Sequence, residues 1–409
     1  MIDRIVIAGG GQAGYQLAQF LRDQQYPGAI LLLGEEPDLP YQRPPLSKIY
    51  LEGKSGPEQL AFQPASYFQR REIEVRTGVR IAAIDRHARR VHTACGQRIE
   101  YGHLVLAVGA RNRELPGLGP LQSVHMLRTR READELRGRL PDIRRATVIG
   151  AGFIGLEFAS VAASQGIAVD VVDTAARLMQ RSVGQPVAEA FQRRHESRGV
   201  RFHLASGTAR ILSEHGRATG VETSAGERLP ADLILVAIGV VPNVEVAAEA
   251  GLAIGNGILV DERLRTTDEH ISALGDCACF ASRFAPNGRC RLESVPNAMS
   301  QARQLAAILA GKASRYEEEL PWFWSDQAGL KLQIAGLSQG ADSWVERSAG
   351  DGAFSAYGFS GHRLVAVESV NRPGDHVIAK RLLGTGARVA PEHVADPLFD
   401  LRHLLAATA

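Results

Sequence analysis

The same glycine-rich unit occurs twice in this chain of 409 residues. Each copy begins with a short apolar run, continues into the pattern G-x-G-x-x-G and ends in a stretch with apolar residues on one helical face. In such a unit the first glycine permits a tight turn, the second lets the backbone approach a pyrophosphate, and the third lets helix and strand pack closely. The helix N-terminus then faces the phosphate charge. The two sets of glycines are Gly9, Gly11 and Gly14, and Gly150, Gly152 and Gly155.

An acidic residue follows the second apolar run of each unit. The run Ile30–Leu33 leads to Glu35 and Glu36, and the run Val169–Val172 leads to Asp173. Counted from the first glycine of its unit, Glu35 lies 26 residues on and Asp173 lies 23 residues on. This is the range expected for a carboxylate that meets a ribose hydroxyl. One glycine pattern alone is weak evidence, because such turns also serve packing, but two complete copies predict two dinucleotide sites.

Length and composition indicate a globular protein of two or three domains. Hydrophobic residues make up 45% and charged residues 22% of the chain, and the formal net charge of +2 does not indicate a nucleic-acid partner. No apolar run reaches the 18 residues of a membrane span. A predicted strand at Arg4–Ala8 leaves no room for a signal peptide. We therefore expect a cytoplasmic protein that binds neither membranes nor nucleic acids.

The four cysteines do not predict a disulfide framework or a metal site. They are too few and too scattered for a secreted scaffold. Cys277 and Cys279 form only a C-x-C, whereas a structural zinc site needs two ligand pairs at wider spacing.

Two dinucleotide sites in one chain are most simply explained by a flavin relay. One site would hold FAD permanently and the other would receive NADH. Hydride would pass from the nicotinamide to the flavin, which can then release single electrons.

Longer sequence blocks carry a resemblance to a known family. The chain resembles the FAD-dependent NADH:ferredoxin reductases that serve bacterial cytochrome P450 and aromatic-ring dioxygenase systems, over almost its whole length. The blocks are YQRPPLSK at 41–48, GAGFIGLE at 150–157, DTAAR at 173–177, GDC at 275–277, ESVPNA at 293–298 and PWFWSDQ at 321–327.

The resemblance implies an α/β fold like that of glutathione reductase, with two Rossmann-type dinucleotide-binding domains and a C-terminal α+β interface domain. The expected FAD-binding domain is discontinuous, at 1–111 and 241–318. The NAD-binding domain is expected at 112–240 and the C-terminal domain at 319–409. Apolar stretches at 104–110 and 233–239, each ending near a glycine, mark the expected crossings between the nucleotide domains.

The resemblance also implies a catalytic pair. Lys48 is expected against the flavin, where a cation stabilises negative charge on the reduced ring. Glu157 is expected to pair with Lys48 and to help orient the nicotinamide. Two alternatives remain open, because Lys48 fits a solvated surface lysine and Glu157 fits an acid that favours the helix dipole.

Further FAD contacts follow from the same resemblance. Glu35 is expected at the adenosine ribose with Glu36 as its competitor, and Asp276 at the ribityl chain or as the N-cap of the following helix. The Ile81 side chain fits an ordinary core position equally well, and Trp324 fits either a cover over the flavin or an ordinary buried aromatic. The expected FAD residues are Gly9, Gly11, Ala13, Gly14, Glu35, Lys48, Ile81, Arg128, Asp276, Val295 and Trp324.

The acid at 173 bears on the choice of nicotinamide. A carboxylate there accepts hydrogen bonds from both ribose hydroxyls and repels a 2′-phosphate, which favours NADH. Arg177 would soften that preference. The expected NAD residues are Gly150, Gly152, Ile154, Gly155, Glu157 and Asp173.

The electrons must leave to an outside acceptor. Related disulfide reductases carry redox cysteines beside the flavin, and the segment 40–51 has none. We expect a transient complex with an acidic [2Fe–2S] ferredoxin, in which Arg303 either contacts the partner or is merely a solvated helix residue. The protein itself is expected to be a monomer or a weak dimer. The alternatives are a rubredoxin reductase and a redox-controlled binding protein resembling apoptosis-inducing factor.

Overall fold

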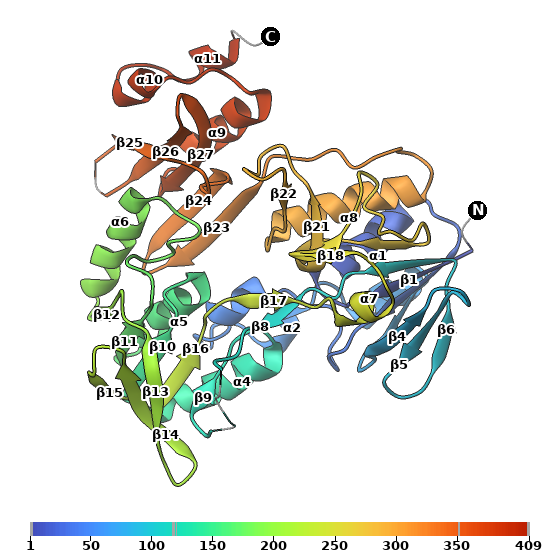
Figure 1. Ribbon diagram of the computed structural model, residues 1–409, viewed down its shortest axis with the longest axis horizontal. Coiled ribbons are helices and arrows are strands. Elements are labelled where there is room, and N and C mark those ends of the chain that lie inside the picture. Colours follow the sequence, from blue (N-terminus) through green and yellow to red (C-terminus); the bar gives the residue numbers. More distant parts are fainter. Residues whose placement is uncertain (1–2, 117–118, 120, 351, 407–409) are drawn as a thin grey trace. The chain divides into compact units, whose positions relative to one another are not determined.

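The computed structural model describes residues 3–116, 119, 121–350 and 352–406 (Figure 1). The chain forms two compact units, and each is built from segments that are far apart in the sequence. Unit 1 comprises Met1–Gln42, Pro57–Arg111 and Val241–Pro321, and unit 2 comprises Arg43–Gly56, Asn112–Val240 and Trp322–Ala409.

Unit 1 is built around a parallel five-stranded sheet in the order β20-β7-β1-β2-β3. Its central strands are largely apolar and buried, whereas the edge strand β3 carries an exposed glutamate. Helix α1 (Gln12–Asp23) follows β1 directly and packs against α8 (Val295–Leu309) (Figure 1). The strands are β1 (Arg4–Ala8), β2 (Ala29–Leu33), β3 (Ile73–Arg76), β7 (His103–Leu106) and β20 (Ile271–Ala273).

Smaller elements complete unit 1. An antiparallel sheet joins β4 (Ile81–Asp85), β5 (Arg90–Thr93) and β6 (Arg98–Glu100). A second small sheet joins β18 (Ile254–Gly255), β19 (Gly257–Leu259), β21 (Ala278–Ala281) and β22 (Arg289–Cys290). The short helices are α2 (Pro57–Leu60), α3 (Ala65–Arg70), α7 (Glu245–Glu249) and the 3-10 turn η3 (Gly275–Cys277).

Unit 2 contains a second parallel five-stranded sheet, in the order β12-β11-β10-β16-β9. Helix α5 (Phe153–Ser164) follows β10 just as α1 follows β1, so the two glycine units fold alike, as the sequence predicts. The strands are β9 (Val124–His125), β10 (Arg145–Ile149), β11 (Ala168–Val172), β12 (Arg201–His203) and β16 (Leu233–Val236). The other elements are the 3-10 turns η1 (Pro44–Ser47) and η2 (Leu140–Asp142), helices α4 (Arg130–Arg139) and α6 (Gln185–Glu196), and the antiparallel strands β13 (Thr208–Glu214), β14 (Arg217–Thr223) and β15 (Arg228–Pro230).

The C-terminal part of unit 2 is the α+β region that the sequence predicts from about residue 319. Its antiparallel sheet has the order β23-β24-β27-β26-β25, and α9 (Pro373–Thr385) packs against β24 and β27 (Figure 1). The strands are β23 (Trp322–Gln327), β24 (Leu330–Gly336), β25 (Ser343–Ser348), β26 (Phe354–Ser360) and β27 (Arg363–Val370), and two short helices follow, α10 (Pro391–Ala395) and α11 (His403–Ala406).

The stretches expected as crossings are shorter as strands than predicted. Strands β7 and β16 end at Leu106 and Val236, and the chain passes between the units at β8 (Ala110–Asn112) and β17 (Val240–Pro242). Across the residues that the structure describes, every helix is too short or too polar to traverse a bilayer.

Candidate functional site

The glycine loop of unit 1 leaves room for a ligand at one position only. A Cβ at Gly9 would overlap the Ala107 carbonyl and a Cβ at Gly14 would overlap the Gly9 carbonyl, so close packing requires both glycines. At Gly11, in contrast, a Cβ would meet no heavy atom of the described residues within 4 Å. Gly11 is also the N-cap of α1, and no side chain caps that helix start. Packing does not explain this glycine, but a pyrophosphate bound to the uncapped N–H groups does.

The glycine loop of unit 2 repeats this arrangement. A Cβ at Gly150 would overlap the Ala237 carbonyl, and one at Gly155 would overlap the Gly150 carbonyl. Gly152 faces open space and begins α5 without a side-chain cap. The side chain of Ile154, in the first turn of that helix, is 42% exposed, which is unusual for isoleucine and fits a position covered by a ligand. Each loop therefore fits a dinucleotide.

Ala13 in unit 1 is buried and packs closely against Gly275. A Cβ added to Gly275, in the GDC block, would lie 2.9 Å from the Ala13 Cβ. The beginning of α1 and the turn η3 thus approach each other closely, which places Asp276 near the first glycine loop.

Asp173, directly after β11, accepts hydrogen bonds from two backbone N–H groups. Its Oδ2 accepts the Ala151 N–H at 2.6 Å and its Oδ1 accepts the Ala175 N–H at 2.8 Å. The bond from Ala151 ties the end of β11 to the glycine loop, the bond from Ala175 is local, and the sequence did not predict either of them. The Arg177 guanidinium donates to the carbonyls of Val183 at 2.6 Å and Gln180 at 3.1 Å.

Glu35 does not hold the position in unit 1 that Asp173 holds in unit 2. Strand β2 ends at Leu33, so Gly34 is the residue directly after it, whereas Asp173 directly follows β11. The Glu35 side chain is 71% exposed, with Arg80 4.0 Å away. Glu36, the competing choice, accepts a hydrogen bond of 2.5 Å from the Tyr41 hydroxyl.

Lys48 and Glu157 form a buried ion pair within unit 2. The Lys48 ammonium nitrogen lies 2.8 Å from Glu157 Oε2, and the two side chains are 21% and 3% exposed. Lys48 follows the 3-10 turn η1, and Glu157 lies beyond the first turn of α5, which contains no acid. The alternative of a first-turn acid on the helix dipole is therefore wrong for Glu157.

Two serines complete the surroundings of this carboxylate, and the sequence did not predict them. The Ser47 hydroxyl donates to Glu157 Oε2, and the Ser325 hydroxyl donates to Oε1 at 2.6 Å. With Lys48, Glu157 has three donors, as expected for an ionised carboxylate in a dry place. Both serines lie in blocks that carry the family resemblance, which was the one available signal for them.

Arg128 and Trp324 also belong to unit 2. The backbone N–H of Arg128 donates to the Glu132 carboxylate at 2.9 Å, and its carbonyl accepts from the Arg43 guanidinium at 2.7 Å. Trp324 is half-buried on β23, with its ring centroid 5.6 Å from that of Trp322.

Ile81, Asp276, Val295 and Arg303 belong to unit 1. Ile81 packs in the main core, in agreement with its interpretation as an ordinary core residue. Asp276 is not an N-cap, because Leu274 precedes η3 and Ser294 caps α8. Val295 is the first residue of α8, directly after that cap. Arg303 is exposed on α8, 3.9 Å from Glu319 and stacked over the Phe20 ring at 5.5 Å.

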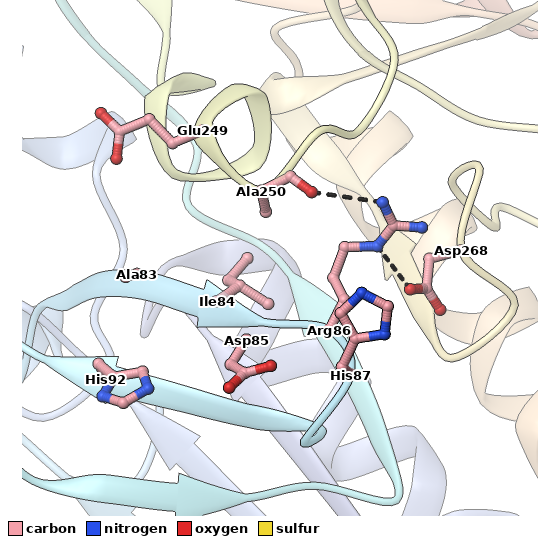
Figure 2. A pocket seen from close by; sticks show the side chains of 9 residues that line it. All are labelled: Ala83, Ile84, Asp85, Arg86, His87, His92, Glu249, Ala250 and Asp268. Atoms are coloured by element: carbon pink, nitrogen blue, oxygen red, sulfur yellow. Dashed lines mark hydrogen bonds and ion pairs between the residues drawn. The ribbon is translucent and has the colours of Figure 1, made fainter.

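A pocket of about 580 Å³ in unit 1 lies away from all of these residues. Figure 2 shows Arg86 at its wall, where the guanidinium donates to Asp268 at 2.7 Å and to the Ala250 carbonyl at 3.3 Å. Because Arg86 and Asp268 already bind each other and no residue of either glycine loop lines the pocket, we do not assign it to the dinucleotides. Its lining is Ala83, Ile84, Asp85, Arg86, His87, His92, Glu249, Ala250 and Asp268.

Comparison with known proteins agrees with this geometry. The family model for pyridine nucleotide-disulphide oxidoreductases matches residues 3–302, and the model for the reductase C-terminal domain matches 322–405. Rhodocoxin reductase of Rhodococcus erythropolis is 48% identical over 404 residues, which cover 98% of this chain and 94% of that protein.

Two solved structures are similar over nearly the whole chain. The ferredoxin reductase for the CYP199A2 system from Rhodopseudomonas palustris has a TM-score of 0.95 at 48% identity and covers 100% of both chains. The covalent putidaredoxin reductase–putidaredoxin complex has a TM-score of 0.95 at 37% identity and covers 99% of both chains. The chain belongs to the pyridine nucleotide-disulphide oxidoreductase family and carries the reductase C-terminal domain.

Proposed function

We propose that this protein passes electrons from NADH through FAD to a [2Fe–2S] ferredoxin that supplies a cytochrome P450 or a similar oxygenase. The observation that carries the proposal is the pair of glycine loops, each with one glycine that faces open space at an uncapped helix start. Two such loops fit two dinucleotides, and enzymes of this family use FAD and a pyridine nucleotide.

FAD would be held by the loop of unit 1 and the nicotinamide cofactor by the loop of unit 2. Support comes from the division of the chain, because unit 1 has segment ends at Arg111, Val241 and Pro321, although Arg43–Gly56 belongs to unit 2. We propose an FAD-binding domain at 1–111 and 241–318, an NAD-binding domain at 112–240 and a C-terminal domain at 319–409. When bound, FAD accepts two electrons together from the nicotinamide and gives them up singly.

The proposed FAD contacts begin at the first glycine loop. Gly9, Gly11 and Gly14 would hold its pyrophosphate with Ala13, and Glu35 or Glu36 its ribose. The backbone N–H of Val295, at the first position of α8, would suit an acceptor edge of the ring. Further contacts are proposed for Ile81, Asp276, Lys48, Arg128 and Trp324.

Lys48 and Glu157 would act as the charged pair beside the reacting rings. Lys48 would stabilise negative charge that develops on the flavin. Glu157 would keep that ammonium in place and neutralise it in the absence of the cofactors, since a lone buried cation is costly. The 2.8 Å separation and the low exposure of both side chains support this assignment.

NADH is the proposed donor in preference to NADPH. Asp173 keeps a negative charge where a 2′-phosphate would lie. Arg177 is the cation nearest in sequence, and its guanidinium already binds the carbonyls of Val183 and Gln180. A 2′-phosphate would therefore be repelled by Asp173, and the Arg177 guanidinium would have to leave its two carbonyls to bind it.

The proposed acceptor is a [2Fe–2S] ferredoxin, bound transiently near Arg303 by a monomer or a weak dimer. The relatives support this class of acceptor, since the two solved structures are named as a ferredoxin reductase and as a complex with putidaredoxin. The segment 40–51 has no cysteine, so a thiol relay has no residues there to use.

Anaerobic mixing followed by turnover tests the proposal. The purified protein, reconstituted with FAD, is mixed with NADH, and loss of the flavin absorbance is followed. A protein that stays colourless, or stays oxidised with excess NADH, contradicts the proposal. Steady-state NADH oxidation is then compared with [2Fe–2S] ferredoxins and with rubredoxins. Faster turnover with rubredoxins favours the rubredoxin reductase, and slow turnover with every carrier favours a redox-controlled binding protein.

A further inference from the structure

A chain of buried hydrogen bonds extends from the Glu157 carboxylate to a histidine on another helix. Ser325 Oγ donates to Glu157 Oε1 at 2.6 Å, and Gln327 Nε2 donates to Ser325 Oγ at 3.1 Å. Gln327 Oε1 lies 2.9 Å from His195 Nε2. All four side chains are buried, each less than 5% exposed. The chain joins β23 to α5 and α6, and every member lies in unit 2.

The direction of the donors along this chain follows from simple chemistry. The Ser325 hydroxyl has one hydrogen, and the carboxylate is its strongest acceptor. Ser325 Oγ must therefore accept from the amide nitrogen of Gln327. The amide oxygen then faces His195, and because that oxygen only accepts, His195 Nε2 carries the hydrogen. Every hydrogen in the chain points toward Glu157.

His195 ends the chain as a neutral ring. Its Nδ1 has no hydrogen-bond partner among the described residues. Burial lowers the pKa of His195, and the positive charge of Arg198 lowers it further, although the bond to Gln327 opposes both. The ring is in edge contact with Phe202, at a centroid distance of 6.2 Å. A neutral donor at this position polarises the chain without adding a cation that would compete with Lys48.

The same glutamine also reaches the loop that carries the NAD-site acid. Gln327 Nε2 lies 3.9 Å from the Met179 sulfur. The backbone N–H of Met179 donates to the Ala151 carbonyl at 2.9 Å, and Ala151 also donates to Asp173. Gln327 thus belongs to the hydrogen-bond chain that ends at Glu157 and also contacts the segment between β11 and α6.

We infer that Ser325, Gln327 and His195 are positioning residues that hold the Glu157 carboxylate in the orientation that Lys48 and the nicotinamide require. The inference rests on the proposed function and deepens it. Cooperative bonds of one direction fix both the place and the charge of the carboxylate.

Conservative and disruptive variants of His195 separate these roles. Glutamine at this position places an amide N–H where Nε2–H lies, whereas leucine removes the donor. We expect His195→Gln to reduce FAD with NADH within about twofold of the wild-type rate. His195→Leu, Gln327→Leu and Ser325→Ala should each be about 3- to 10-fold slower, because each removes or misdirects a donor to a charged acceptor.

The acidic limb of the pH profile supplies a second kinetic readout. Ser325→Ala removes a hydrogen bond to the charged carboxylate, so its profile should differ from that of the wild type. Ser355→Ala is the matched control, since Ser355 is equally buried in the same sheet but binds Ser369 and Asp375. That variant should keep the wild-type rate and profile.

Nitrogen-15 NMR of histidine-labelled holoenzyme gives a readout that does not depend on activity. The His195 signal, identified by its loss in His195→Gln, should show a neutral ring protonated at Nε2, and Gln327→Leu should change it. A charged ring or an Nδ1–H tautomer at neutral pH overturns the inference, as do wild-type rates and pH profiles in both Gln327→Leu and Ser325→Ala. A wild-type protein that NADH does not reduce contradicts the proposed function instead.

Discussion

Both carboxylate oxygens of Glu368 accept the backbone N–H of Gly184, at 2.8 Å and 3.0 Å. Gly184 is the N-cap of α6, and Glu368 lies fully buried on β27. The carboxyl group thus satisfies the backbone N–H of the N-cap residue and joins the C-terminal sheet to α6. The Ser338 hydroxyl also donates to Glu368 at 2.5 Å.

This contact predicts a stability that falls as the pH rises. Burial raises the pKa of Glu368 from 4.5 to about 7, although Ser338, Gly184 and Arg177 oppose the shift. The folded protein therefore holds a proton that the unfolded chain releases between pH 4.5 and about 7, and the contribution of Glu368 is most favourable below that window. In urea unfolding, Glu368→Gln should lose this dependence, a difference of roughly 1–3 kcal/mol across the window. Parallel curves for both proteins would contradict the prediction.

Removing one partner of the Lys48–Glu157 pair should damage catalysis more than binding. In Glu157→Gln the lysine keeps a hydrogen-bond acceptor but loses the charge that positions it. We expect kcat/KM for NADH with ferricyanide as acceptor to fall about 10- to 100-fold, while FAD content stays unchanged. Glu189→Gln, an exposed change on α6, is the control. A loss below twofold in Glu157→Gln would remove this residue from the proposed mechanism.

Local sequence was sufficient to predict the two nucleotide-binding units. Strand β1 begins and ends at Arg4 and Ala8, as expected, because an apolar run and a glycine turn are each determined within a few residues. The end of β2 at Leu33 agrees with the predicted apolar run for the same reason. The C-terminal α+β region was expected from the family resemblance.

The surroundings of Glu157 were largely beyond prediction. Ser47, Ser325 and the link from Gln327 to His195 join positions that lie 110, 168 and 132 residues apart along the chain. Such contacts depend on how β23 packs on α5 and α6, and on which way each side chain points, and neither has a local signal. Lys48 and Glu157 were singled out only because known relatives pair them.

Discrimination between the nicotinamide cofactors should depend on Asp173 and not on Arg177. We expect wild-type kcat/KM to favour NADH over NADPH by about tenfold or more, and Asp173→Asn to reduce the ratio, because the neutral amide no longer repels a 2′-phosphate. Arg177→Met should lower the thermal midpoint, since Val183 and Gln180 lose their donor, yet leave the ratio unchanged. A ratio that changes in Arg177→Met would show that this guanidinium leaves its carbonyls to bind the cofactor.

Substitutions at the two open glycines, Gly11 and Gly152, should each weaken the binding of one cofactor. Gly11 and Gly152 have φ values of −78° and −83°, which any residue adopts, and a Cβ at either would meet no described neighbour. Gly11→Ala should therefore fold normally but retain less FAD, measured as the ratio of flavin to protein absorbance. Gly152→Ala should keep its FAD and raise KM for NADH about 10-fold, because the added methyl group obstructs the pyrophosphate.

Gly14, which close packing requires, serves as the comparison for the two open glycines. Gly14→Ala should lower the thermal midpoint and the yield of folded protein, since its Cβ would overlap the Gly9 carbonyl. If Gly11→Ala instead loses stability while keeping its FAD, the glycine serves packing and the first loop is not the FAD site. If Gly152→Ala loses FAD while its KM for NADH is unchanged, the two cofactors have been assigned to the wrong loops.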